Sequence, residues 1–188
     1  MDPEDLDPDP IAQFHAWYDP SDASVCLATA SPSGPDARMV LLKGADAGGF
    51  VFFTNATSTK GQQLAVEPSA ALVFHWPPRQ VRVRGRVELV SDAESDAYWV
   101  TRPRGSQLGA WASQQSTVLS SRGVLEERLA AVTAEFEGRE VPRPAYWRGY
   151  RIVPRTIEFW HHRDDRLHDR VRYRREEEGA WTRERLAP

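Results

Sequence analysis

Cysteine, lysine and long apolar runs are scarce in this sequence. Its 188 residues include a single cysteine, Cys26, which excludes a disulfide or a cysteine-based zinc site within one chain. Cys26 lies in the apolar run from Val25 to Ala28, so we expect a buried small hydrophobic side chain. No apolar run approaches the roughly 20 residues of a membrane-spanning helix, and the acidic, proline-rich start carries no signal-peptide core. We therefore expect a cytoplasmic protein with no membrane partner.

Several nucleotide-binding and catalytic motifs are also absent. The sequence has no glycine-rich dinucleotide turn, no Walker phosphate loop and no Gly-x-Ser-x-Gly elbow, so nicotinamide-binding, P-loop and α/β-hydrolase folds have no support. The net charge is −3, so no overall positive field favours nucleic acid. Nucleic-acid binding by a basic strand face at Arg82, Arg84 and Arg86 stays open as an alternative, to be tested by a salt-dependent gel shift.

Strand signals dominate the organisation of the chain. Its length and 40% hydrophobic composition favour a single domain at residues 11–188, preceded by a flexible arm at residues 1–10. The clearest strand alternates Val81, Val83 and Val87 with arginines, which predicts one buried and one solvated face. We predict strands at 24–30, 37–43, 49–55, 70–76, 79–90, 150–153, 156–160, 171–175 and 181–186, and helices at 11–18, 58–66, 91–101 and 121–136. This pattern predicts a mainly β fold, a small antiparallel β-barrel with helices added.

Four segments place cationic side chains beside hydrogen-bond donors: 38–43, 57–60, 102–116 and 166–170. Lys43 and Lys60, the two lysines of the chain, both fall in these segments. Cations beside amides and hydroxyls are typical of anion binding, and arginine suits phosphate through its two-pronged guanidinium. Four such segments indicate several phosphates, or a phosphorylated cofactor together with a phosphorylated substrate.

The first two segments also have purely structural interpretations. Ser58-Thr-Lys60 opens a predicted helix directly after a strand, so it could hold a phosphate at the helix N-terminus or form an ordinary N-cap. Arg38 and Lys43 bracket a strand with their side chains on opposite faces, and they could simply be a solvated strand end.

The C-terminal segment has three interpretations. Arg166, His168 and Arg170 alternate, so on an extended chain they would line one side and could share an anionic ligand. They could equally form an exposed charged loop. A metal site using His168 with His161 and His162 lacks the spacing and carboxylates of a convincing one.

Taken in order along the chain, these segments resemble the pyridoxamine 5′-phosphate oxidase family of FMN enzymes. The resemblance covers nearly the whole chain, from Asp9 to Pro188. The motifs that carry it are Arg38-Met-Val-Leu-Leu-Lys43, Phe53-Thr-Asn55 with Ser58-Thr-Lys60, Arg79-Gln-Val81, Tyr98-x-x-x-Arg102-Pro-Arg-x-Ser106-Gln, Gly109-Ala-Trp-Ala-Ser-Gln-Gln-Ser116, Ile157-Glu-Phe-Trp160, Arg166-Leu-His-Asp-Arg170 and Arg185-Leu-Ala-Pro188.

The resemblance implies an FMN-binding split β-barrel of Greek-key type, and a homodimer with FMN at the interface. It implies oxidation of pyridoxine or pyridoxamine 5′-phosphate to pyridoxal 5′-phosphate with O2 as acceptor, without a metal. The implied FMN-binding residues are Arg38, Met39, Val40, Leu41, Leu42, Lys43, Phe53, Thr54, Thr59, Lys60, Gln80, Gln115, Ser116, Trp160 and Arg170. The implied substrate-binding residues are Lys43, Tyr98, Arg102, Ser106, Arg166 and His168, and the last two are the implied catalytic pair, acting as orienting and electrostatic groups.

Two departures from the family pattern bear on affinity and substrate preference. Thr59 stands where the family commonly has an arginine, and the N-terminal arm is short and lacks an Arg/Tyr segment. A flavin- or pyridoxal-phosphate-binding protein without turnover, and a split-barrel flavin oxidoreductase acting on another substrate, therefore remain as alternatives. Peroxide release with pyridoxine 5′-phosphate separates them from the oxidase.

Overall fold

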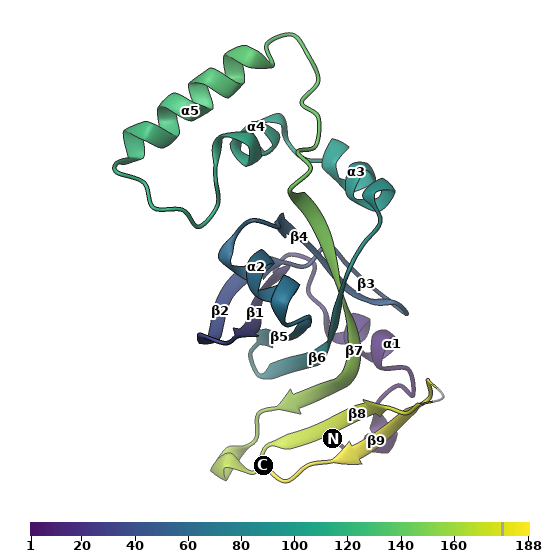
Figure 1. Cartoon of the computed structure of the whole chain (residues 1–188). Coiled ribbons are helices and arrows are strands. Elements are labelled where there is room, and N and C mark those ends of the chain that lie inside the picture. Colours follow the sequence, from purple (N-terminus) through teal and green to yellow (C-terminus); the bar gives the residue numbers. More distant parts are fainter. Residues whose placement is uncertain (178) are drawn as a thin grey trace.

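The computed structural model describes residues 1–177 and 179–188 (Figure 1). The strands of this part are β1 (Ser24–Ser31), β2 (Gly34–Leu41), β3 (Gly44–Asp46), β4 (Gly49–Asn55), β5 (Ser69–Trp76), β6 (Arg79–Leu89), β7 (Trp147–His161), β8 (Asp169–Arg175) and β9 (Trp181–Arg185). The helices are α1 (Pro10–Trp17), α2 (Thr59–Val66), α3 (Asp92–Val100), α4 (Arg104–Ala112) and α5 (Arg122–Glu135), with short 3-10 turns η1 (Pro3–Asp5) and η2 (Asp164–Arg166).

All strand pairs are antiparallel and form one sheet in the order β2-β1-β5-β6-β7-β4-β3, with β8 and β9 added beside β7. The long strand β7 runs through the whole molecule: helices α3, α4 and α5 lie beyond its start, and the β8–β9 hairpin lies beside its end (Figure 1). The predicted mainly β fold is confirmed. The sheet therefore joins a helical end and a hairpin end, and each carries part of the candidate site.

Strand β7 corrects one prediction, because residues 150–153 and 156–160 belong to one strand. Pro154 lies between the two predicted segments and cannot donate a ladder hydrogen bond. The structure places it beside a register shift between Arg84 and Gly85 of β6. A side chain on Gly85 would lie 2.0 Å from the Val153 carbonyl oxygen, so only glycine allows the two strands this close.

The core lies between the inner face of the sheet and helix α1. Phe14 of α1 packs against Phe50 and Phe74, with ring centroids 4.9 and 5.0 Å away. The predicted alternation of β6 is confirmed, because Val81, Val83 and Val87 are buried. Cys26 is only partly buried, because its neighbours on β1 take the inward positions.

The helical end has its own apolar cluster, formed by Trp99, Leu108, Phe136, Val141 and Trp147. Ser91 caps α3 as predicted, accepting a hydrogen bond from the Glu94 backbone. Helix α4 was not predicted, because the polar run from Arg102 to Ser116 has no clear apolar stripe. No helix in the described ranges is long and apolar enough to cross a membrane.

The N-terminal residues differ from the predicted flexible arm. Leu6 is buried in the main core, and Arg183 of β9 donates hydrogen bonds to the carbonyl oxygens of Pro3 and Leu6. The Tyr173 hydroxyl donates to the carbonyl of Asp7, at 2.6 Å, and burial raises the pKa of Tyr173 to about 12. One apolar side chain and three backbone carbonyls thus tie the arm to the β8–β9 hairpin.

Candidate functional site

A cavity of about 370 Å³ opens where β2, β4, α2, α3 and α4 meet. It is lined by Met39, Val40, Leu41, Lys43, Phe53, Thr54, Lys60, Tyr98, Arg102, Pro103, Ser106, Gln115 and Trp147. All of these except Pro103 and Trp147 are predicted site residues. An adjoining cavity of about 310 Å³ shares Phe53, Thr54, Arg102, Ser106, Gln115 and Trp147 with it. The fold therefore brings together residues of the segments 38–43, 57–60 and 102–116, which are far apart in the sequence, whereas the segment 166–170 contributes none.

The charge of the cavity is positive. Lys43, Lys60 and Arg102 line it, and none of its lining residues is acidic. The Asp36 carboxylate acts on Lys60 from outside this lining and is paired with Arg38. Lys60 donates to the Gln115 side-chain oxygen at 3.0 Å. Burial lowers the pKa of Lys60, and the nearby Arg38 lowers it further. Three cations without a facing carboxylate favour an anionic ligand.

Arg102 has the most unusual surroundings of the three cations. Its guanidinium carbon lies 5.0 Å from the ring centroid of Trp99 and 4.7 Å from that of Trp147. Its Nη1 is buried, and no described residue accepts a hydrogen bond from it. Burial also lowers the pKa of Arg102. Two rings hold the cation in place, but its buried Nη1 has no acceptor among the described residues, which is the arrangement expected of a site for an anion.

Aromatic rings form one wall of the cavity. Phe53 stacks on Tyr98 with centroids 4.3 Å apart, and on Trp147 at 5.1 Å with the planes 8° apart. The Lys43 ammonium lies 5.6 Å from the Tyr98 centroid. Parallel rings beside cations can bind a flat aromatic molecule that carries a phosphate.

The start of α2 supplies the polar edge of this cavity. Ser58 is the N-cap, as predicted, and its side chain accepts from the Gly61 backbone. Thr54 at the end of β4 donates to Gln115 at 3.2 Å. Thr59, at the first position of α2, is exposed and is not among the lining residues.

A second set of predicted residues lies at the other end of the sheet. Gln80, Trp160 and Arg170 are aligned across β6, β7 and β8. His168 packs on Trp160 with centroids 4.6 Å apart. Arg170 donates through Nε to the buried Glu158 carboxylate at 2.9 Å. None of these residues lines the cavity described above, so within one chain the two sets form separate clusters.

The predicted extended segment at 166–170 is only partly correct. Arg170 lies in β8, but Arg166 lies in the turn η2 with φ 60°. Arg166 therefore does not continue the alternation that was used to group it with Arg170. The alternative histidine metal site is not formed either, because no three potential ligands gather for a metal in the described part of the chain.

Three more predicted residues lie outside the cavity lining. Arg38 donates to the Thr29 hydroxyl and to the Gln63 side chain. Leu42 is buried in the main core, and Ser116 is exposed with φ 72°. In one chain, these three residues have structural contacts or face solvent. Any contact with FMN stays a prediction.

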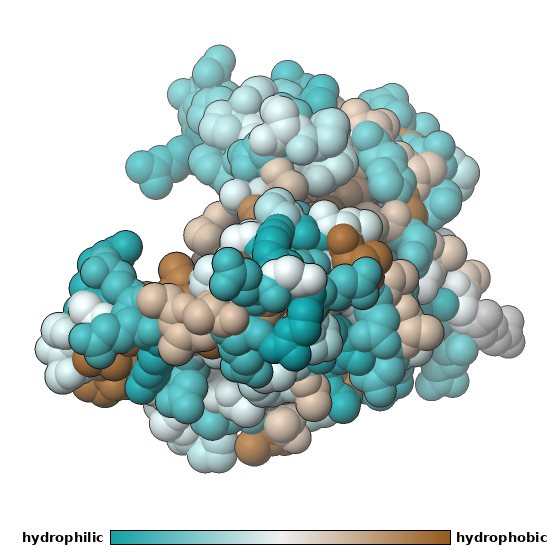
Figure 2. Space-filling view, turned by 90° about the horizontal axis from the view of Figure 1, so that it is seen from above, coloured by the Kyte–Doolittle hydropathy of each residue, from teal (hydrophilic) through white to brown (hydrophobic). Residues whose placement is uncertain are grey.

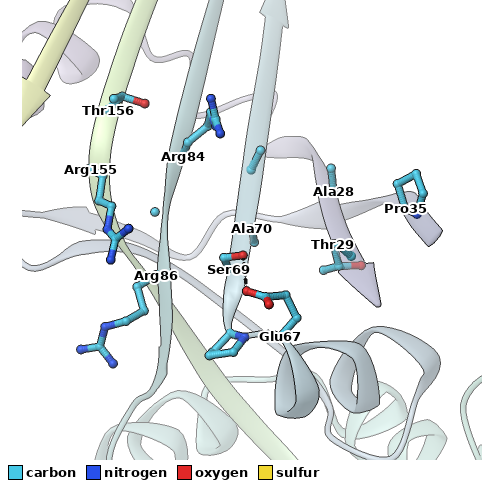
Figure 3. Close-up of a pocket in the computed structure, with 14 residues that line it drawn as sticks. Ala28, Thr29, Pro35, Glu67, Ser69, Ala70, Arg84, Arg86, Arg155 and Thr156 are labelled. Carbon is cyan, nitrogen blue, oxygen red and sulfur yellow. Dashed lines mark hydrogen bonds between the residues drawn. The ribbon is translucent and has the colours of Figure 1, made fainter. Parts of the chain in front are cut away.

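A cavity of about 690 Å³ on the outer face of the sheet is larger but chemically separate. Figure 3 shows Arg84, Arg86 and Arg155 on one side of it and Ser69 and Glu67 on the other. None of the predicted FMN or substrate residues lines it. Volume alone therefore does not locate the site, and we assign it by the convergence of cations and rings.

The arginine row on β6 does not form a continuous free basic face. Arg82 pairs with Glu158 at 2.5 Å, and Arg86 pairs with Glu88. The view of Figure 2 shows a largely hydrophilic surface with small separate hydrophobic patches. The alternative of nucleic-acid binding through this strand is weakened by these two ion pairs.

Two tryptophans of the site were missed at the level of sequence. Trp147 lies beside Asn55 in the β4–β7 ladder, and Trp99 faces Arg102 from α3. Their role depends on contacts between distant segments, so spacing gave no signal for Trp147. For Trp99, its position three residues before Arg102 at the end of a predicted helix was a usable signal, because residues at this spacing can meet across one turn, as the hydrogen bond from the Arg102 N–H to the Trp99 carbonyl shows.

Comparison with known proteins places the fold in a class. The solved structure of PhzG from Burkholderia lata 383, in complex with tetrahydrophenazine-1-carboxylic acid, has a TM-score of 0.90, 30% identity and coverage of 99% of this chain and 96% of that one. A pyridoxamine 5′-phosphate oxidase-related, FMN-binding protein from Nostoc punctiforme has a TM-score of 0.70 and 19% identity, covering 88% and 87%. The architecture is that of the split β-barrel proteins.

Sequence profiles and relatives narrow this class to one family. Residues 13–135 match the family described as pyridoxamine 5′-phosphate oxidase, and residues 147–188 match the pyridoxine 5′-phosphate oxidase C-terminal dimerisation region. A pyridoxine/pyridoxamine 5′-phosphate oxidase of Mesorhizobium japonicum is 54% identical, covering 96% of this chain and 93% of the relative. One of Cupriavidus pinatubonensis is 52% identical, covering 100% and 93%. The chain belongs to the pyridoxamine 5′-phosphate oxidase family.

Proposed function

We propose that this protein is an FMN-dependent oxidase that converts pyridoxine or pyridoxamine 5′-phosphate to pyridoxal 5′-phosphate, with O2 as electron acceptor. The observation that carries the proposal is the cavity in which Arg102, with an unpartnered buried Nη1, lies beside Lys43, Tyr98 and Ser106. The names of relatives that are more than 50% identical over nearly the whole chain support the same activity.

The residues present fit FMN as well as a phosphorylated substrate. Lys60, Thr54 and Gln115 form a polar edge at the start of α2, where a helix N-terminus and an ammonium favour a phosphate. Arg102 lies across the cavity among aromatic rings and suits the phosphate of the substrate. When bound, FMN supplies the hydride acceptor that no amino-acid side chain provides.

The chain's own residues then bind and orient the substrate. Arg102, Ser106 and Tyr98 hold its phosphate, and Lys43 adds a point charge beside the Tyr98 ring. Arg166 and His168 lie against the pyridine ring as orienting groups. Fixing the reacting carbon close to the acceptor is the main contribution of the protein, since the cofactor carries the redox chemistry.

Two clusters in one chain suggest that each site draws on two chains. The residues of the cavity and the Gln80–Trp160–Arg170 row do not meet within a protomer. The dimerisation region at residues 147–188 contains Trp160, His168 and Arg170. In the proposed homodimer, this row from one protomer faces the cavity of its partner with FMN between them.

A related activity is the best-defined alternative. PhzG was solved with tetrahydrophenazine-1-carboxylic acid, a ligand without a phosphate, but it is only 30% identical to this chain. The cation set around Arg102 and the set around Lys60 favour two phosphorylated molecules instead. The cytoplasmic location stays a prediction.

The direct test is turnover by the FMN-reconstituted protein. We expect yellow protein that releases peroxide and forms pyridoxal 5′-phosphate from pyridoxine 5′-phosphate, measured by a coupled peroxide assay and by product absorbance. The unphosphorylated vitamin is the matched control, and its kcat/KM should be lower by about tenfold or more because a charge-assisted contact is lost. Tight flavin binding without turnover would instead support a storage or sensing protein.

Arg170 provides a separate test of the cofactor assignment. We expect Arg170→Ala to raise the dissociation constant of FMN about tenfold or more, because a charged hydrogen bond to FMN would be lost. Excess FMN should restore much of its activity by mass action. His168→Ala should keep its flavin and gain nothing from added FMN. An FMN titration followed by flavin fluorescence and peroxide release checks both, and equal rescue of the two variants would contradict the assignment.

A further inference from the structure

The turn between β7 and β8 has a backbone that is held under strain. Asp165 and Arg166 have φ of 54° and 60°, the left-handed region that residues with a side chain rarely adopt. Leu167 comes next, and His168 and Asp169 follow it. Two consecutive residues in this region must be held in place by contacts from the surrounding residues.

Arg163 joins the start of this turn to its end through two hydrogen bonds. Its backbone N–H donates to His168 Nδ1 at 3.2 Å, and its side-chain Nε donates to Asp169 Oδ2 at 2.7 Å. The hydrogen bond from Arg163 is the main cause that lowers the pKa of Asp169 to about 2, so this carboxylate is ionised throughout the range of an enzyme assay. The Asp169 side chain is 13% exposed and the Arg163 side chain is 54% exposed. Arg163 can therefore be replaced without opening a cavity in the core.

The hydrogen bond to Nδ1 decides the chemistry of the His168 ring. A nitrogen that accepts from a backbone N–H must carry its lone pair, so the proton of the neutral ring is on Nε2. Trp160 packs at 4.6 Å and His162 at 5.2 Å from the His168 centroid, which fixes the plane of the ring. Neutral His168 therefore offers an N–H donor at Nε2 and has no free lone pair for a proton.

We propose that Arg163 is a positioning residue that holds His168 as an Nε2–H hydrogen-bond donor toward the substrate. This rests on the proposed contact of His168 with the substrate. It removes His168 from the candidates for a general base, because both ring nitrogens of its neutral form are already committed. Arg163 is not among the residues assigned above to the substrate or the cofactor.

The kinetic test uses Arg163→Ala, Asp169→Asn and the double variant in the FMN-loaded enzyme. Arg163→Ala should raise KM for pyridoxine 5′-phosphate about fivefold, the size expected for loss of a partly exposed ion pair, and Asp169→Asn should raise it at least as much, with kcat changed less than about twofold. The double variant should be no worse than Asp169→Asn, because that change alone removes the ion pair with Arg163, together with the pairs from the Met1 ammonium and Arg185 to the same carboxylate. Arg163→Lys should restore most of the lost affinity.

The control is Arg174→Ala, which breaks an arginine–carboxylate pair with Glu184 on the same hairpin but away from the turn. It should leave KM unchanged. Additive effects of Arg163→Ala and Asp169→Asn, or an equal rise of KM in Arg174→Ala, would overturn the positioning role of Arg163.

The tautomer is read directly by 15N NMR of histidine-labelled holoenzyme, with His168 assigned through His168→Gln. At a pH where the ring is neutral, we expect the Nε2–H tautomer in the native protein. We expect a mixture of tautomers in Arg163→Ala, which keeps the backbone N–H but loses the side-chain ion pair that holds the turn. An Nδ1–H ring in the native protein, or the same ring in both proteins, would overturn the proposal. The spectrum needs no turnover, so a protein without oxidase activity would disprove the proposed function while the tautomer is still decided.

Discussion

Replacing Arg102 with alanine is expected to weaken binding of the phosphorylated substrate by about 1.5 to 3 kcal/mol, roughly 10- to 150-fold, while FMN stays bound. The reason is that its guanidinium lies against both Trp99 and Trp147, with a buried Nη1 that no described residue satisfies. The measurement pairs substrate titration, by flavin absorbance under anaerobic conditions, with the flavin content of the purified variant.

Two further variants sharpen this test. Arg102→Lys keeps the charge but loses the planar fork, so it should recover only part of the affinity. Arg155→Ala removes an exposed arginine from the larger cavity on the outer sheet face and should change neither affinity. Loss of flavin in Arg102→Ala with unaltered substrate affinity would assign Arg102 to the cofactor instead. A substrate defect in Arg155→Ala would move the site to the larger cavity.

Local sequence signals predicted the elements that depend on local physics. Ser58 and Ser91 were predicted to begin helices, because their side chains can accept from the backbone of the first turn, and both do. The alternation along β6 correctly predicted its buried valines. The resemblance to the family then added a set of residues that the cavity largely brings together.

The same local sequence signals could not predict contacts between residues that are far apart in the sequence. Trp147 joins the site only because β7 pairs with β4, and that pairing links residues about ninety positions apart. The strand β7 was predicted as two segments, 150–153 and 156–160, and the feature that accommodates Pro154 between them, the close approach at Gly85, lies on another strand. Arg166 was placed on an extended segment because a left-handed backbone at a residue with a side chain leaves no mark in the spacing.

Active-site complementation is the strongest test of a site shared between two chains. Arg102→Ala and His168→Ala should each have low activity at subsaturating substrate as homodimers. In a heterodimer of the two, one site receives both defects and the other receives neither, if each site takes Arg102 from one protomer and His168 from its partner. Coexpression with two affinity tags isolates this heterodimer, and we expect about half the native kcat/KM per dimer from its one intact site.

Within one chain, Arg102 and His168 lie near opposite ends of β7, so only a shared site predicts activity in the heterodimer. Arg102 lies beyond the start of β7 and His168 beyond its end, and the fifteen residues of that strand separate them. At about 3.3 Å of rise per residue, an extended strand of this length holds the two side chains far apart in a protomer. A site completed within one chain would leave a defect in every protomer of the heterodimer. Its activity would then stay at the level of the homodimeric variants, and the shared site would be wrong.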